Sequence, residues 1–358
     1  MSGPVVSVVI PAYRSGRLLR EAVDSVMAQT FKDFEIILVD NNADEETKKE
    51  ISEILRSYPQ KVRTIHEPDQ GNCSARNRGI LEARGEYIAL LDDDDKMYSD
   101  RLECQVATAR DHPEATVIYG LIDVISFDGS KIMIPRLAPS VEFFLRPVMK
   151  DHPRYRTDPP LLVLPSVMLF SRDKALKVGL FDTSYNPCHT EDTDFCFRLW
   201  NMGPFKGIDR PLSMYRQASS TFFAKKRKGI MNWLQVRKNQ DLFLQKLANQ
   251  YLDHQDRKIL GKFREVQAQL LRETSHDILS YKDGREIARR FLLRAIQAKP
   301  LDYKNWKWFL RTWYPSKQLE KSLKREILPS RLAEDVPDLT LFDRLYQLPQ
   351  ESSQKKYR

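Results

Sequence analysis

The sequence predicts an α/β protein in which a doubly wound, mostly parallel sheet is followed by a helical C-terminal region. Short apolar runs alternate with amphipathic helical patterns through the first half of the chain, as is typical of parallel sheets. One such run, Tyr87–Leu91, leads directly into four consecutive aspartates at 92–95. Beyond a KKRK segment at 225–228 the pattern is helical only.

The order of the expected elements follows from the spacing of apolar residues. Strands are expected at Val5–Tyr13, Phe34–Asp40, Lys61–His66, Tyr87–Leu91, Thr116–Ser126, Leu161–Phe170 and Leu212–Arg216. Helices are expected at Arg17–Gln29, Asp44–Tyr58, Gly71–Arg84, Asp100–Asp111, Arg172–Val178 and Asp192–Trp200. The continuous β-branched run of the first strand is typical of a central parallel strand. No GxGxxG follows it, which argues against a dinucleotide-binding dehydrogenase. The proline-rich, basic stretch 135–160 is interpreted as a long mobile segment near the site.

Three helical stripes are expected in the rear of the chain. Their residues are Ile259, Phe263, Val266 and Leu270, then Ile287, Phe291 and Ala295, and finally Trp306, Leu310 and Trp313. We therefore expect a catalytic domain at 1–222, a basic helical region at 223–350 and a polar tail at 351–358.

Charge is unevenly distributed along the 358 residues. Residues 221–358 carry 30 Lys and Arg against 16 Asp and Glu, while the front is slightly acidic. No secretory signal opens the sequence, and no apolar run approaches the ~18 residues needed to span a bilayer. The four cysteines (Cys73, Cys104, Cys188 and Cys196) form no CxxC pair and are interpreted as packing residues, so a reducing cytoplasm is expected.

The four aspartates are the first candidate site. Like charges this close raise one another's pKa values, and a divalent cation such as Mg²⁺ or Mn²⁺ would remove that cost. In open α/β sheets, ligands bind beyond the carboxyl ends of the strands, where these residues are expected. The alternative is a solvated acidic turn, with Asp95 or Ser99 capping the next helix.

Five motifs in order resemble glycosyltransferase family 2, whose members are inverting enzymes with the GT-A fold. The motifs are VSVVIPAY, EIILVDNN, GNCSARNRGI, YIALLDDDD, and GLFD followed by TEDTDFCFRL. The resemblance covers roughly residues 5–217 and implies a Rossmann-like nucleotide-binding half. The rear of the chain resembles no family that we can name.

The resemblance implies a role for nine residues. The nucleotide base pocket would be lined by Pro11, Ala12, Tyr13 and Asp40, with Arg76 beside it; Asp92 would contact the ribose, Asp94 would hold the metal, Asp192 would be the catalytic base, and Glu191 would help hold the acceptor. A carboxylate that removes the proton of an acceptor hydroxyl, opposite a metal-neutralised diphosphate, suits single displacement. Each residue also has a structural alternative: Asp40 could cap a turn, Arg76 could form a surface ion pair, Asp192 could complement a helix dipole, and Glu191 could be structural.

The sequence also departs from the family pattern. Many relatives carry a histidine after the Tyr215-Arg216 equivalent, whereas QASST follows here, and Lys225, Lys226 and Arg227 could serve the diphosphate instead. The second strand reads VDNNADEET rather than the commoner Asp-Asp-Gly-Ser form, which affects the expected contacts to the base.

The expected partners are a nucleotide-sugar donor, UDP-sugar by resemblance, and a glycan or lipid-linked acceptor. The basic rear region could contact an anionic membrane at the inner face of the plasma membrane, or its stripes could simply pack together. Nucleic acid is not expected. Two other classes are weighed: a nucleotidyltransferase, for which PAYRSGR lacks the glycine-rich, lysine-bearing signature, and a non-catalytic scaffold, for which an intact Asp-x-Asp and Glu-Asp pair would be unexplained.

Overall fold

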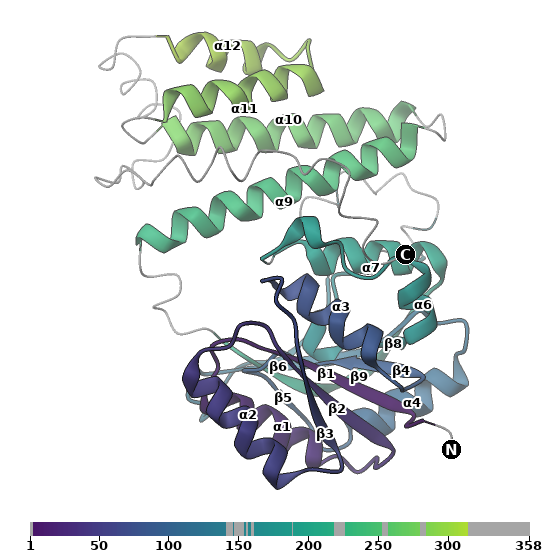
Figure 1. Ribbon diagram of the computed structural model, residues 1–358. Helices are drawn as coiled ribbons and strands as arrows, with labels where there is room; N and C mark the ends of the chain where they lie inside the picture. The colour runs from purple at the N-terminus through teal and green to yellow at the C-terminus, as the bar shows by residue number, and fades with distance from the viewer. Residues whose placement is uncertain are drawn as a thin grey trace. The chain divides into compact units, whose positions relative to one another are not determined.

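The computed structural model describes residues 3–140, 146, 154, 157–158, 161–187, 189–217, 226–252, 257–279 and 284–313 (Figure 1). The chain divides into two compact units. The first comprises residues 1–142 and 157–219, and the second, the helical unit, comprises 143–156 and 220–358.

The first unit is built on a nine-stranded mixed sheet with the strand order β3-β2-β1-β4-β8-β6-β9-β5, in which β7 pairs with β6. Its strands are β1 (Val6–Ala12), β2 (Phe34–Asp40), β3 (Val62–His66), β4 (Tyr87–Leu90), β5 (Lys96–Met97), β6 (Val117–Ile125), β7 (Ile132–Leu137), β8 (Leu169–Ser171) and β9 (Phe205–Arg216). The first four strands run parallel, and β6 runs parallel to β9. The predicted α/β class is confirmed.

Helices cover both faces of this sheet. They are α1 (Arg17–Met27), α2 (Glu45–Ser57), α3 (Asn72–Glu82), α4 (Arg101–Asp111), α6 (Arg172–Lys177) and α7 (Glu191–Met202), with short 3-10 turns η1 (Pro165–Val167) and η2 (Thr183–Tyr185). On one face, Val6, Val8 and Ile10 of β1 form a core with the apolar sides of α1, α2 and α4. Alternate residues of a strand point to opposite faces, so this set accounts for half of β1.

The opposite face of the sheet is covered by α3, with α7 on the same side (Figure 1). Gly79 allows α3 to approach closely, because a Cβ there would lie 2.3 Å from Cγ1 of Val9. Phe195 of α7 stacks on Phe181 with ring centroids 4.1 Å apart and meets Phe170 of β8 edge-on. These contacts bring α3 and α7 to the carboxyl ends of the central strands.

Three sequence expectations for this unit need correction. The strand expected at Leu161–Phe170 is η1 followed by the short β8, because Pro165 cannot donate to a sheet ladder. The strand expected at Leu212–Arg216 is longer and begins at Phe205. β7 was not expected, since its first residues precede the proline-rich stretch and Pro135 lies within it; the pairing of β7 with β6 alone makes it an edge strand, where proline is tolerated. Most of residues 141–160 lie outside the described residues.

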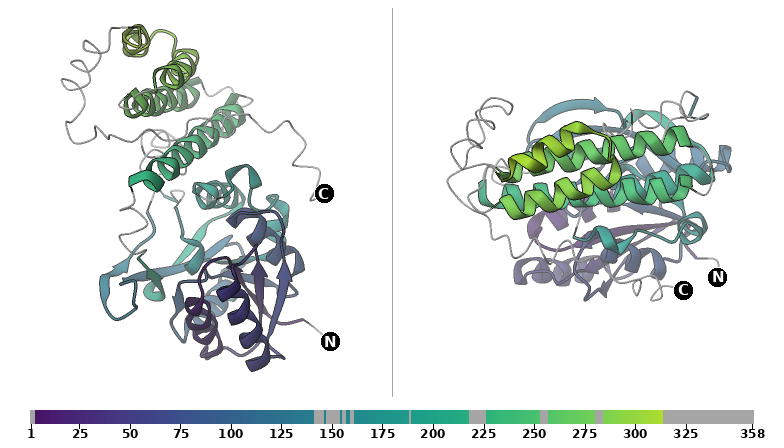
Figure 2. Two further views of the ribbon diagram at one scale, coloured as in Figure 1. Left: turned by 60° about the vertical axis from the view of Figure 1, so that its left-hand side comes forward. Right: turned by 90° about the horizontal axis from the view of Figure 1, so that it is seen from above.

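The helical unit contains α9 (Lys226–Leu252), α10 (Arg257–Leu279), α11 (Arg285–Ala298) and α12 (Tyr303–Arg311), which pack in that order (Figure 2). Phe263 and Leu270 of the α10 stripe are buried as expected and Val266 is half-buried, while the side chain of Ile259 lies outside the described residues. All three residues of the α11 stripe are buried as expected. The stripe on α12 is exposed, and Trp308 occupies the core in its place. None of the helices that the structure describes is long and apolar enough to cross a membrane.

Candidate functional site

The predicted site residues gather where β1, β2 and β4 end. β4 stops at Leu90 and the four aspartates follow, next to Tyr13 at the end of β1. The backbone N–H of Tyr13 donates to Oδ2 of Asp93 at 3.0 Å. Pro11 and Ala12 are the last residues of β1, and the Tyr13 ring is partly exposed beside them. The strand ends thus place these three residues and the aspartate turn at one edge of the sheet.

Asp40, at the end of β2, is engaged in local contacts. Its Oδ1 accepts the backbone N–H of Ala43 at 2.8 Å, and its Oδ2 lies 3.8 Å from Nδ1 of His66. The contact of Asp40 with the Ala43 N–H is therefore the turn-capping contact that the structural alternative expected. The next residue, Asn41, is buried and fixes the loop after β3, since its Nδ2 donates to two carbonyls there, those of Glu67 and Asp69.

Arg76 of α3 bridges two carboxylates from different elements. Its Nη2 donates to Oδ1 of Asp92 at 2.9 Å, and its Nη1 donates to Oε1 of Glu191 at 3.0 Å. Burial alone lowers the pKa of this guanidinium, but Asp92 and Glu191 raise it above its ordinary value. The side chain is buried, so the surface ion-pair alternative for Arg76 is wrong. One guanidinium instead connects the aspartate turn to the start of α7.

The start of α7 presents the expected catalytic pair in a strained setting. His189 and Thr190 have φ angles of 75° and 73°, in the left-handed region that costs a non-glycine residue roughly 1–2 kcal/mol. Asp192 lies half-buried in the first turn, where its Oδ1 accepts the Thr193 N–H at 2.8 Å and the helix dipole favours its negative charge. Glu191 is buried, and its Oε2 has no hydrogen-bond partner among the residues described.

Two asparagines attach the loops before α7 to α3. Asn77 donates from Nδ2 to the Phe181 carbonyl at 2.8 Å, and its Oδ1 accepts the Phe181 N–H at 2.9 Å. Oδ1 of Asn186 accepts the N–H of Cys73 at 3.1 Å. Gly71 leaves room for Asn186, because a Cβ at Gly71 would lie 2.3 Å from the Asn186 side chain. Two of the sequence motifs, GNCSARNRGI and GLFD, thus meet through hydrogen bonds between Asn77 and the backbone of Phe181.

The aspartate turn carries more negative charge than its surroundings stabilise. Burial, followed by the charges of Asp93 and Asp92, raises the pKa of Asp94 to about 7. Burial likewise raises the pKa of Asp93 to about 6. Carboxyl groups with such pKa values are partly protonated at neutral pH, so a bound cation would return them to the charged form.

The residues present fit a divalent cation shared with a phosphate ligand. Within the described ranges, no three His, Cys, Asp or Glu side chains are grouped so as to hold a metal ion by themselves. Mg²⁺ is commonly bound through one or two carboxylates, with phosphate oxygens and water completing the set. Asp94, half-buried and with a raised pKa, is suited to such a shared site.

Two residues at the end of β9 also belong to the site and were not predicted. Arg216 donates its N–H to Oδ1 of Asp95 at 2.7 Å and its Nε–H to the Asp94 carbonyl at 2.7 Å, which fixes the turn. Burial and then the nearby aspartates, including Asp94 and Asp192, raise the pKa of Tyr215. The sequence signal was present, because both residues precede the position of the missing histidine.

Below the turn, Arg101 of α4 is completely buried. Its five N–H groups meet five neutral oxygens, namely Gln105 Oε1, Ser213 Oγ and the carbonyls of Leu90, Ser166 and Met168. This cation fastens the end of β4 to η1, β8 and β9. Nothing in its sequence context distinguishes it from a surface arginine in the first turn of a helix.

Comparison with known proteins identifies the family. A family model described as Glycosyl transferase family 2 matches residues 7–178. An uncharacterized glycosyltransferase of Methanocaldococcus jannaschii is 31% identical over 222 residues, which are 60% of this chain and 72% of that protein. The chain belongs to glycosyltransferase family 2. The expectation drawn from the five motifs is confirmed.

Other family 2 relatives share a smaller part of their length with this chain. An uncharacterized glycosyltransferase of Rickettsia prowazekii is 30% identical over 205 residues, which are 56% of this chain and 59% of that protein. One from Rickettsia felis is 36% identical over 131 residues, which are 36% of this chain and only 21% of that protein. The chain thus spans between a fifth and three fifths of these two relatives.

Solved structures support the fold. The crystal structure of S. aureus TarS residues 1–349 has a TM-score of 0.57 at 18% identity and covers 89% of this chain and 91% of that one. The same fragment in complex with UDP-GlcNAc gives a TM-score of 0.58 at 15% identity. At this identity the similarity concerns the fold alone, and the predicted GT-A fold is confirmed.

Proposed function

We propose that this chain transfers a sugar from a nucleotide-diphosphate donor, a UDP-sugar, to a hydroxyl of a glycan or lipid-linked acceptor, with inversion at the anomeric carbon. One observation carries the proposal. Arg76 joins Asp92, at the edge where ligands of open α/β sheets bind, to Glu191 at the start of α7. Asp92 and Glu191, which precedes the proposed base Asp192, are therefore held in one arrangement.

The donor would lie across the ends of β1, β2 and β4. Pro11, Ala12 and Tyr13 would contact the base with Asp40 nearby, and Asp92 would accept hydrogen bonds from the ribose. The S. aureus TarS fragment with the similar fold was solved with UDP-GlcNAc, which supports a UDP-sugar as donor. Lys225, proposed from the sequence to reach the diphosphate with Lys226 and Arg227, lies outside the described residues.

The reaction would be a single displacement. Asp192 removes the proton of the acceptor hydroxyl, that oxygen attacks the anomeric carbon, and the bond to the diphosphate oxygen breaks with its electron pair leaving on the nucleotide. Glu191 Oε2, buried with no partner among the described residues, accepts a hydrogen bond from the acceptor. Asp94 would hold Mn²⁺ or Mg²⁺, which when bound neutralises the charge that develops on the diphosphate.

The rival classes explain less of the geometry. A nucleotidyltransferase would need a phosphate-binding loop after β1, where the chain has PAYRSGR. A scaffold would not need a left-handed pair of residues before Asp192, since such strain persists where the surrounding structure holds it and clusters at active sites. Both rivals leave the Arg76 bridge without a role.

The test combines nucleotide binding with one substitution. UDP-, GDP- and dTDP-sugars are added with Mn²⁺, Mg²⁺ or EDTA, and the melting temperature is measured, because a ligand of the folded state raises it. Asp192→Asn should keep the UDP-dependent rise but lower kcat by about 10²- to 10⁴-fold. The matched control is Asp173→Asn, which removes an exposed first-turn carboxylate from α6. Transfer by Asp192→Asn at the parental rate would refute the base assignment.

We also propose peripheral contact with an anionic membrane, made by the exposed face of α12. Tyr303, Trp306 and Leu310 recur at helical spacing and are 69%, 44% and 58% exposed, and Trp313 follows just after the helix. Residues 285–311 carry eight lysines and arginines against two acidic residues. Aromatic side chains flanked by basic ones suit the headgroup region of anionic bilayers, and this charge complementarity favours lipid over a protein partner.

Vesicle flotation tests this contact. The protein should float with phosphatidylserine vesicles, less so as salt rises, and not with phosphatidylcholine alone. Leu310→Gln should weaken binding several-fold, whereas Leu293→Gln, an exposed leucine on α11, should not. Equal binding of both variants, or a stable dimer that is lost in Leu310→Gln, would show that another partner covers α12.

A further inference from the structure

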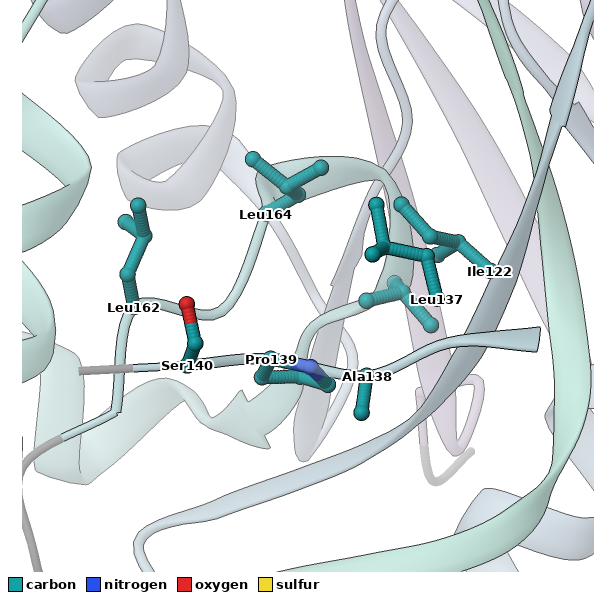
Figure 3. A pocket seen from close by; sticks show the side chains of 8 residues that line it. Ile122, Leu137, Ala138, Pro139, Ser140, Leu162 and Leu164 are labelled. Carbon is teal, nitrogen blue, oxygen red and sulfur yellow. The ribbon is translucent and has the colours of Figure 1, made fainter. Parts of the chain in front are cut away.

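The first unit contains a cavity that the proposed chemistry does not use. Its volume is about 160 Å³, and it lies between β6, the segment after β7 and the chain around η1 (Figure 3). The lining residues are Ile122, Leu137, Ala138, Pro139, Ser140, Leu162, Leu164 and Val167. All of them are described, and they come from three separate stretches of the chain.

One wall of the cavity is shared with the candidate site. Ser166 Oγ accepts the backbone N–H of Asp92 at 3.1 Å. Three residues earlier, the Val163 carbonyl accepts the thiol of Cys196, which lies on α7 one turn after Asp192, at 3.8 Å. The segment that supplies Leu162, Leu164 and Val167 therefore touches both the aspartate turn and the helix of the proposed base.

The chemistry of the cavity favours an apolar occupant. Among the described lining residues only Ser140 carries a polar side chain, and the Ser140 carbonyl already accepts the Leu162 N–H at 3.0 Å. A sugar ring placed here would leave its hydroxyl groups without partners, which is costly. An apolar cavity of roughly 150 Å³ is large enough for a benzene-sized hydrocarbon. The lining therefore selects a hydrocarbon group about the size of a phenyl ring.

The surface beside the cavity is also apolar. β7, which supplies Leu137, also carries Ile132, Met133 and Ile134, each about half exposed. A hydrocarbon longer than the cavity would find further apolar contacts along the same strand. The apolar lining and the adjoining strand thus favour the same class of ligand.

We propose that this cavity is an apolar subsite for the acceptor, occupied by a hydrocarbon group attached near the sugar that receives transfer. This inference rests on the proposed function, since it assigns the acceptor to the side of the site walled by residues 162–167. It narrows the acceptor class to sugars that carry an aryl or alkyl group, as opposed to an unmodified glycan.

Methyl NMR gives a direct test, because five lining residues carry methyl groups beyond Cβ: Ile122, Leu137, Leu162, Leu164 and Val167. The methyl-labelled full chain is titrated with phenyl β-D-glucoside and, separately, with methyl β-D-glucoside. Only the phenyl compound should shift these resonances. The methyls of Leu293, which is 45% exposed on α11, report non-specific adsorption, and shifts of equal size there would overturn the proposal.

Two variants locate the effect. The Ser140 side chain points toward the space between Leu162 and Leu164 (Figure 3), so Ser140→Phe should fill the cavity and abolish the shifts. Ser52→Phe adds the same ring at an exposed position on α2 and should leave the shifts intact. In transfer assays, phenyl glycosides should show a kcat/KM roughly ten- to hundredfold above that of the matching methyl glycosides. Ser140→Phe should remove this ratio while sparing the methyl glycosides.

A parallel melting-temperature measurement with UDP separates the two hypotheses. A UDP-dependent rise without shifts at the lining methyls would overturn the subsite and leave the proposed function standing. Shifts at the lining methyls without nucleotide binding or transfer would refute the proposed function, and the acceptor role of the cavity with it.

Discussion

Two arginines near the aspartate turn, Arg76 and Arg101, are buried, and their positive charges are stabilised in different ways. Arg76 is neutralised by the carboxylates of Asp92 and Glu191, which raise its pKa. Arg101 donates hydrogen bonds to neutral oxygens, and burial, partly offset by the charge of Asp95, lowers its pKa to about 9. The charge of Arg76 is balanced by carboxylates, whereas that of Arg101 is stabilised mainly by uncharged backbone and side-chain oxygens.

These two environments indicate different roles for the two arginines, one in the site and one in the fold. A buried ion pair contributes little net stability but costs much when broken, and it fixes which groups lie together. A cation held by carbonyls satisfies strand ends that would otherwise lack partners. We therefore expect Arg76 to govern the arrangement of the site and Arg101 to govern the integrity of the fold.

The largest effect should come from Arg101→Met. The change leaves the Leu90 and Met168 carbonyls buried with a donor removed, and the free energy of unfolding should fall by about 4 kcal/mol, measured by urea titration. Arg110→Met, at an exposed position on the same helix, should change it by less than about 0.5 kcal/mol.

If Arg101→Met does not fold, Arg101→Lys keeps the charge with three donors and should give an intermediate loss of stability. Parental stability in Arg101→Met would mean that the five hydrogen bonds contribute nothing net, and the architectural role of Arg101 would be wrong.

A smaller effect, about 3 kcal/mol, is expected for Arg76→Met, which leaves the buried Glu191 and the half-buried Asp92 without their cation. Adding Glu191→Gln should recover part of this loss, because one stranded charge is removed, and a double-mutant cycle measures the coupling. Sugar transfer should not recover with stability, since α7 would still lack its tie to Asp92. Simple additivity of the two changes would contradict the bridge.

The smallest effect should come from a third arginine pair, near the surface. Burial alone would raise the pKa of Glu35, but hydrogen bonds from Arg63, Ser7 and the Arg84 N–H lower it below its ordinary value. After allowance for solvent screening, Glu35→Gln should cost about 0.5–1 kcal/mol at pH 7.

The pH dependence of this pair follows from the sign of the shift. A lowered pKa in the folded state stabilises the protein fully above the ordinary pKa of glutamate, near 4.3, and the stabilisation is lost as the pH falls toward the folded value. Urea titrations of parent and Glu35→Gln should therefore converge below about pH 4. A gap that widens on acidification would contradict the lowered pKa.

The sequence was informative wherever a residue's role followed from its place on an element. The aspartates after β4 could be assigned to the edge where ligands bind because they follow the carboxyl end of a strand, whereas the roles of Glu191 and Asp192 came from the family resemblance. The family and the GT-A fold followed from motifs at those same positions.

Other features depended on contacts between distant segments. In the sequence, Arg101 looks like an ordinary helix residue. It is a buried cation only because η1, β8 and β9 pack around it. The stripe on α12 matched a helical period, but periodicity does not say which apolar face is covered, and Trp308 displaced the expected residues from the core. The cavity around Leu164 likewise depends on three stretches that no local pattern links.

The left-handed pair His189 and Thr190 has a consequence for protein engineering. Glycine at either position would relax the backbone and could raise the melting temperature, since glycine adopts these angles without cost. The same change would loosen the segment that leads into Asp192, the proposed base. Selection for a higher melting temperature alone would favour glycine at these two positions and would lower the rate that the proposed base supports. Stabilising substitutions are therefore better sought in the helical unit.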